Sequence, residues 1–203
     1  MKSALDYLEQ LKNHHYETFL HSHRVAGLSL AISKQLGCTQ KEQEEIYYGG
    51  ILHDIGKLKV HKDILNKPGK LTLEEWKWIQ QHPVLGYQML QGLSINPNIR
   101  EIVLIHHERL NGRGYPFGLK NDQISLGALI VAVSDSFDAM TNNRPYHRLK
   151  TVQEAIVELE REKNSLYSPQ VVEALIETQL VRGRRGNWLE DGVGFRINGK
   201  NIL

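Results

Sequence analysis

Cysteine is almost missing from this chain of 203 residues, since Cys38 is the only one. A single cysteine excludes an internal disulfide framework and a cysteine-rich metal site, and it fits a reducing compartment. The net charge of +2 is too small to indicate bulk attraction to nucleic acid or to a membrane surface. The longest apolar run, Ala128 to Val133, is far too short to span a bilayer. The first residues lack the apolar core of a signal peptide, so we expect a cytoplasmic protein without a membrane span.

Apolar residues recur with helical spacing along most of the chain, which predicts an all-α fold, a single helical bundle. We expect one domain over residues 1–180, followed by a basic linker and tail over 181–203. Asn198-Gly199 is a preferred two-residue hairpin turn, so the tail is expected to be a small β-hairpin or a frayed end. Helices are expected at about 3–13, 16–36, 72–80, 82–92, 97–107, 125–140, 151–163 and 169–180. A further helix is expected to open at Thr39 and to carry His53-Asp54, and residues 111–120 are expected to form a loop.

Histidine is what the chain has in quantity, with ten residues, several of them inside periodic apolar segments. Glu17 and His21 are four positions apart and therefore share one helical face, a common way for a helix to offer two metal ligands. A solvated carboxylate–imidazole pair has the same spacing. His53 and Asp54 are adjacent, and neighbouring helical side chains point about 100° apart. They suit an ion pair, with Asp54 bridging two ions and His53 binding one, but a buried histidine bonded to its neighbour is the simpler alternative.

Two further polar groups stand where burial would be costly. His106 and His107 close an apolar helix, and Asp135 ends the most hydrophobic run in the chain. No lysine or arginine lies within one helical turn of Asp135, so its carboxylate needs a cation, a metal or a network of donors. Several histidines with carboxylates and no thiolate suit iron or manganese better than a structural zinc. The alternative is an α-helical domain whose core histidines only form hydrogen bonds. It would require many of these residues to match a metal-ligand pattern by chance.

The order of these motifs resembles the HD-GYP family, a branch of the HD phosphohydrolase superfamily. The matching stretches are HDIGK at 53–57, His82-Pro83, HHERLNGRGYP at 106–116 and SDSFDAMTNNRPY at 134–146. The resemblance runs from about Glu17 to Ala174 and implies a helical bundle with two or three divalent metal ions, iron or manganese, at its centre. The metal ligands that it implies are His21, His53, Asp54, His82, His106, His107 and Asp135, with Glu17 added where a third ion is held.

The same resemblance implies hydrolysis of cyclic di-GMP to linear pGpG, in some members onward to GMP. Its catalytic residues would be His53, Asp54 and Lys57, which surround the ions that activate water for attack on the phosphodiester. The loop over 111–120 has been proposed in the family to touch diguanylate cyclase domains. The substrate contacts that the resemblance implies are Lys57, Arg109, Tyr115, Arg144 and His147.

The chain departs from the family pattern at Leu110, Asn111, His147, Tyr167 and Ser168. None of them is an expected metal ligand, so the departures bear on substrate and loop contacts. They leave open a weakly catalytic signalling module that binds the nucleotide or a cyclase. They also leave open an HD hydrolase that acts on another cyclic dinucleotide or on a nucleotide phosphate.

Overall fold

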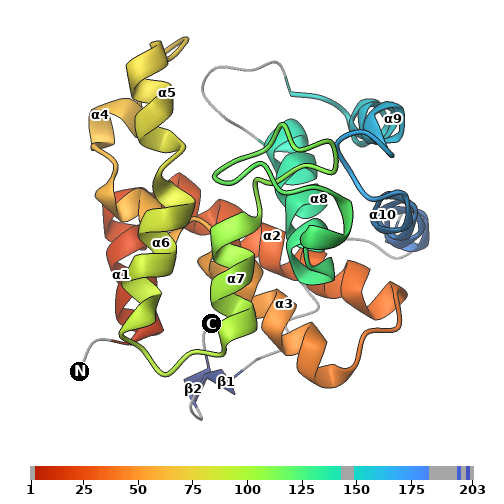
Figure 1. The fold of residues 1–203 in the computed structure, drawn as a ribbon, viewed down its shortest axis with the longest axis horizontal. Helices are drawn as coiled ribbons and strands as arrows, with labels where there is room; N and C mark the ends of the chain where they lie inside the picture. Colours follow the sequence, from red (N-terminus) through yellow and green to blue (C-terminus); the bar gives the residue numbers. More distant parts are fainter. Residues whose placement is uncertain (1–2, 143–148, 183–195, 198–199, 202–203) are drawn as a thin grey trace.

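The computed structural model describes residues 3–142, 149–182, 196–197 and 200–201 of the chain. Helices dominate this part, as the periodicity predicts, and the bundle is all-α apart from two very short strands (Figure 1). No helix within these ranges is long and apolar enough to cross a membrane. The helices are α1 (Ala4–His14), α2 (Tyr16–Gln35), α3 (Gln40–Leu52), η1 (Ile55–Lys59), α4 (Lys62–Leu65), α5 (Leu73–Ile79), α6 (His82–Gln91), α7 (Pro97–Ile105), η2 (Asn121–Gln123), α8 (Leu126–Thr141), α9 (Val152–Glu162) and α10 (Pro169–Arg182).

Helix starts follow the capping signals in the sequence. Thr39 accepts a hydrogen bond from the backbone of Glu42, whose side chain bonds back to Thr39, so the capping box predicted before α3 is present. Thr72 and Glu75 form the same box before α5, again as predicted. These local bonds fix where the helices begin, because they satisfy backbone N–H groups that have no partner within the helix.

The core lies between α2, α3, α7 and α8, which occupy the middle of the molecule in Figure 1. One buried apolar cluster joins α2 and α8 to α9 and α10, and includes Val25, Ile130 and Leu175. A second joins α1, α3 and α6, and includes Leu11, Ile51 and Leu90. Helices therefore cover both sides of α2 and α3, and the side chains at the ends of these helices are held in a packed environment.

The end of α3 corrects one expectation, that a helix carries the His53-Asp54 pair. The helix ends at Leu52, His53 is its C-cap, and Asp54 precedes η1 with ψ near 6°. The chain turns after the pair, and the two side chains meet, with His53 Nε2 3.4 Å from Asp54 Oδ2. Helix α3 packs closely against α7 at Gly49, where a Cβ atom would come within 2.6 Å of the Ile102 side chain.

The C-terminal tail contributes the strands. β1 (Arg196–Ile197) and β2 (Lys200–Asn201) pair antiparallel, with Arg196 opposite Asn201 and Ile197 opposite Lys200. This is the register that the expected hairpin requires. Its Asn198-Gly199 turn and most of the basic linker lie outside the described residues. The division of the chain into a domain over 1–180 and a tail stays a prediction.

Candidate metal centre

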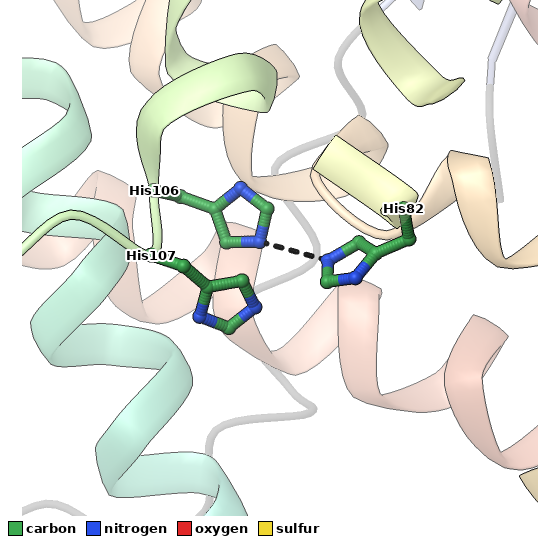
Figure 2. A group of neighbouring side chains, drawn as sticks. All are labelled: His82, His106 and His107. Carbon is green, nitrogen blue, oxygen red and sulfur yellow. Dashed lines mark hydrogen bonds between the residues drawn. The ribbon is translucent and has the colours of Figure 1, made fainter. Parts of the chain in front are cut away.

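Two groups of histidine and carboxylate side chains meet in the interior of the bundle. The first consists of His82, His106 and His107, and the second of His21, His53 and Asp54. Within each group the ligand atoms lie within 4.8 Å of one another. Figure 2 shows the three imidazoles of the first group facing one another, from the start of α6 and the end of α7.

Backbone carbonyls orient three of these imidazoles. The Nδ1–H groups of His53, His82 and His106 donate to the carbonyls of Gly50, Ile79 and Val103, at 2.6, 2.7 and 2.9 Å. Each carbonyl belongs to the residue three positions earlier, so the helix end itself aims the ring. A neutral imidazole carries one proton, so these bonds leave Nε2 of each ring as a lone pair directed into the centre.

The lone pairs are placed as ligands of a cation. His82 Nε2 and His106 Nε2 are only 3.3 Å apart, joined by the dashed line in Figure 2, although neither has a proton to share. Within the described part of the chain, buried His53 Nε2 and Asp54 Oδ1 have no hydrogen-bond partner. Buried polar atoms without partners are costly and rare in native proteins. A divalent ion bound to nitrogen and oxygen satisfies them, so the residues fit the metals that the family resemblance implies.

Asp54 lies between the two groups. Its Oδ1 atom is 3.2 Å from His82 Nε2, while Oδ2 is 3.4 Å from His53 Nε2 and 3.8 Å from His21 Nε2. This position suits the bridging role that we expect for Asp54. Asp135 on α8 completes the ring from the other side, with Oδ1 3.0 Å from His21 Nε2 and Oδ2 3.9 Å from His107 Nδ1.

Burial and the neighbouring charges favour the metal-binding protonation states of His82, His106, His107 and Asp54. At His21 burial is outweighed by Asp135 and Asp138, which raise the pKa of that imidazole. Burial lowers the pKa of His82 to about 4, and it holds the pKa of His106 and His107 well below their usual range. Burial alone would raise the pKa of Asp54, but the charge of Lys57 and the nearby histidines hold it well below the ordinary value. Neutral imidazoles and ionised carboxylates are the ligand forms.

His21 is held by a carboxylate that sequence reasoning missed. Its Nδ1–H donates to Asp138 Oδ2 at 2.6 Å, and Asp138 in turn accepts bonds from Arg24 at 2.7 and 2.9 Å. A carboxylate behind a histidine fixes the ring and raises its basicity as a ligand. Asp138 follows Asp135 by three positions on α8, which is a spacing that places both on one side of the helix. That spacing was the available signal.

Gly56 brings the two halves of the centre together. A Cβ atom at this position would lie 2.0 Å from the carbonyl oxygen of His82 and 2.6 Å from the amide of Gly86. Glycine therefore lets η1 contact the start of α6, which places His82 beside Asp54. Gly56 lies inside η1, where its role is to allow this close approach.

The loop after α7 is folded onto the centre by Glu108. This buried carboxylate accepts hydrogen bonds from the backbone N–H groups of Phe117, Gly118 and Leu119, at 2.6, 3.2 and 3.0 Å. Tyr115, which precedes a cis proline, stacks on the imidazole of His107 with ring centroids 4.6 Å apart. The structural task of Glu108 was also missed, although its place in the HHE motif was noted, because its partners are backbone groups about ten residues further along.

The remaining predicted site residues are placed as follows. Glu17 is exposed on α2 and belongs to neither ligand group of the described residues, so its binding of a third ion stays a prediction. Lys57 Nζ is 2.6 Å from Asp54 Oδ2 at the rim of the centre. The Arg109 guanidinium donates to the carbonyls of His106 and Glu108 and lies over the Tyr167 ring, which anchors the loop. Arg144 and His147 lie outside the described residues.

Comparison with known proteins identifies the family. The HD domain family matches residues 6–171. A cyclic di-GMP phosphodiesterase of Thermotoga maritima is 45% identical over 166 residues, which cover 80% of this chain and 45% of that protein. A cyclic di-GMP phosphodiesterase of Pseudomonas aeruginosa is 41% identical over 209 residues, covering 99% of this chain and 50% of that protein. The chain thus spans about half the length of these curated relatives.

A solved structure shares the fold. The HDG"Y"P protein Bd1817 from Bdellovibrio bacteriovorus superimposes with a TM-score of 0.67 at 24% identity, over 80% of this chain and 52% of that one. The family match covers most of the chain, and the histidine and aspartate motifs meet in one buried centre as the family pattern requires. The chain therefore belongs to the HD-domain family, in its HD-GYP branch.

Proposed function

We propose that the chain is a metal-dependent phosphodiesterase that hydrolyses cyclic di-GMP to pGpG. The observation that carries the proposal is the meeting of buried imidazole lone pairs and carboxylate oxygens without hydrogen-bond partners. The names of the similar proteins from Thermotoga maritima and Pseudomonas aeruginosa support cyclic di-GMP as the substrate. We infer two ions, of iron or manganese, and a third where Glu17 joins the ligands.

Divalent ions at such a centre supply hydroxide near neutral pH and offset the negative charge of the phosphate. The residues of the chain prepare the site for this chemistry. The carbonyl-bound histidines keep their lone pairs directed inward, and Lys57 places an ammonium group beside Asp54, where it would neutralise a non-bridging phosphate oxygen. Water adds to phosphorus, the bond to the 3′ oxygen breaks, and the proton passes to the leaving oxygen.

The loop after α7 is proposed to hold the nucleotide and a protein partner. Tyr115 forms a wall of the site beside His107, whereas Phe117 is 60% exposed on the same loop. Phe117 is therefore available to the diguanylate cyclase domains that we expect as partners. Arg109 would act on substrate through this loop. We expect Arg144 to bind the second phosphate and His147 to contact substrate. We also propose that the protein acts in the cytoplasm.

The test is a product assay on protein loaded anaerobically with Fe(II) or Mn(II). We expect the wild type to convert cyclic di-GMP to pGpG, and His53→Ala to lose this activity by several orders of magnitude. His61→Ala removes an exposed histidine shortly after the HDIGK stretch and should retain the activity. Including 3′3′-cGAMP and cyclic di-AMP as substrates tests the choice of base.

One result would overturn the enzymatic proposal. If the fully metal-loaded wild type leaves cyclic di-GMP intact while His53→Ala binds the nucleotide as tightly as the wild type, the chain is a binding module. Opening of another cyclic dinucleotide in preference to cyclic di-GMP would reassign the substrate.

A further inference from the structure

Helix α5 exposes a large aromatic side chain close to the metal centre. Trp76 is 44% exposed, although tryptophan is usually buried over most of its surface. The helix is held in place at its start by the Thr72–Glu75 capping box and by an ion pair of 2.7 Å between Lys67 and Glu75. The exposure of Trp76 is therefore a property of an anchored helix.

An aromatic path connects Trp76 to the metal ligands. Its ring lies edge to face with Tyr115, with centroids 6.5 Å apart and an angle of 79° between the planes. Tyr115 stacks on His107, and the His107 ring is 5.0 Å from that of His82. Figure 1 shows α5 rising above the bundle on the side of α6, whose first residue is His82.

We propose that Trp76 stacks on one purine base of the substrate, with the Tyr115 ring against the edge of that base, and that Trp76 is a substrate-positioning residue. This inference rests on the proposed function, because a phosphodiester at the metal centre fixes where its bases can lie. In a cyclic dinucleotide each base is joined to its phosphate through one sugar, so it extends past the ligands onto the surrounding wall. Tyr115 and Trp76 are the aromatic groups on that wall. Each base stacked on an aromatic side chain typically strengthens binding roughly 5- to 150-fold.

The same helix offers a matched control in Trp78, which is 54% exposed. Residues two positions apart on a helix point to nearly opposite sides, so Trp78 cannot share the direction of Trp76 toward Tyr115. A general loss of apolar surface from α5 would affect both positions equally. A stacking contact with substrate would affect Trp76 alone.

The experiment compares Mn(II)-loaded wild type with Trp76→Ala, Trp76→Phe and Trp78→Ala. Affinity is measured with a phosphorothioate analogue of cyclic di-GMP, and KM and kcat are measured with cyclic di-GMP itself. We expect Trp76→Ala to raise Kd and KM about tenfold with kcat and metal content within twofold of wild type. Trp76→Phe should recover most of the affinity, and Trp78→Ala should match the wild type.

Fluorescence provides a readout that a purely structural role would not change. Stacking of a purine on an indole should quench Trp76 emission when the analogue is added. The quenching should disappear in Trp76→Phe and persist in Trp78→Phe.

The outcomes separate this inference from the proposed function. If the wild type hydrolyses cyclic di-GMP and Trp76→Ala keeps its Kd within twofold, the assignment of Trp76 is wrong while the enzymatic proposal stands. An equal loss in Trp76→Ala and Trp78→Ala also overturns it. If the wild type binds the analogue with Trp76-dependent quenching but does not hydrolyse cyclic di-GMP, the stacking role stands and the enzymatic proposal falls. A wild type that neither binds the analogue nor hydrolyses cyclic di-GMP contradicts both.

Discussion

His21 shows how a single buried ligand is prepared for its task. Its Nε2 atom faces Asp135, while its Nδ1–H group is bound by Asp138, which Arg24 holds from the solvent side. Burial alone would raise the pKa of Asp138, but the bonds from His21 and Arg24 lower it, so the carboxylate stays charged. The orientation of His21 therefore depends on a residue that touches no metal.

We predict that Asp138→Asn weakens metal affinity about 10- to 100-fold, as loss of a carboxylate behind a histidine ligand typically does. The amide keeps the size of the side chain but removes the charge that orients His21 and pairs with Arg24. Titration of the metal-free protein with Mn(II) measures the effect, and Asp122→Asn on the exposed η2 is the matched control. An affinity within twofold of wild type, with an unchanged circular dichroism spectrum, would refute the role of Asp138.

At this scale the sequence pointed to most of the side chains that meet in the candidate centre, but it did not point to the residues that support them. His53, His106 and Asp135 could be found because a polar group inside an apolar segment is costly and therefore informative, whereas His82 came only from the family resemblance. Trp76 carries no such signal, since an exposed aromatic residue on an amphipathic helix looks ordinary in a sequence. Its place becomes visible only when the loop carrying Tyr115 is seen beside α5.

Among the elements, the contact between η1 and α6 holds the two ligand groups together. The contact depends on Gly56, because any side chain there meets backbone atoms of His82 and Gly86 that cannot rotate away. We predict that Gly56→Ala destabilises the fold by about 1–3 kcal/mol, as overpacking does, and that it lowers metal content by displacing His82. Thermal unfolding and elemental analysis measure the two effects.

Gly27→Ala on α2 is the control for the same chemical change. Apart from its chain neighbours and the backbone of its own helix, no described atom lies within 4 Å of a Cβ atom built there. Since alanine favours a helix over glycine by about 1 kcal/mol, this variant should be as stable as the wild type or more stable. If Gly56→Ala unfolds at the temperature of Gly27→Ala and binds metal normally, close approach at η1 is not what positions His82.

The loop after α7 depends in the same way on Glu108. Glu108→Gln leaves fewer acceptor positions for three backbone N–H groups, and we predict a loss of about 1–3 kcal/mol in stability. Hydrogen exchange at residues 117–119 should accelerate, and kcat/KM should fall because Tyr115 loses its support. Glu9→Gln, at an exposed position on α1, should change none of these quantities. Unchanged exchange in Glu108→Gln would show that other contacts hold the loop.

The order and limits of most helices followed from periodicity and capping boxes. The end of α3 did not, because the turn at His53-Asp54 is set by the contact of η1 with α6 and not by a local stop signal. Tertiary packing decides such boundaries where local preferences are neutral.

Across the whole molecule, the ligands come from α2, the end of α3, α6, the end of α7 and α8. Ions bound there connect elements that are far apart in the sequence, and the unfolded chain has no comparable site. When only the folded state binds the ion, an ion concentration a hundredfold above Kd raises the free energy of unfolding by about 3 kcal/mol. For a chain of this size this raises Tm by about 5–10 °C. We predict that Tm falls by this amount on treatment with a chelator and recovers on addition of Mn(II). An equal Tm with and without the chelator would contradict the coupling.

The most direct test of the account is X-ray diffraction from crystals of the anaerobically loaded protein, measured at the iron and manganese absorption edges. We predict anomalous peaks at the two ligand groups, one beside His82, His106 and His107 and one beside His21 and His53, with Asp54 between them. A third peak beside Glu17 would establish the three-ion site. A correctly folded protein with the same side-chain positions and no anomalous peak at either group would contradict the central claim.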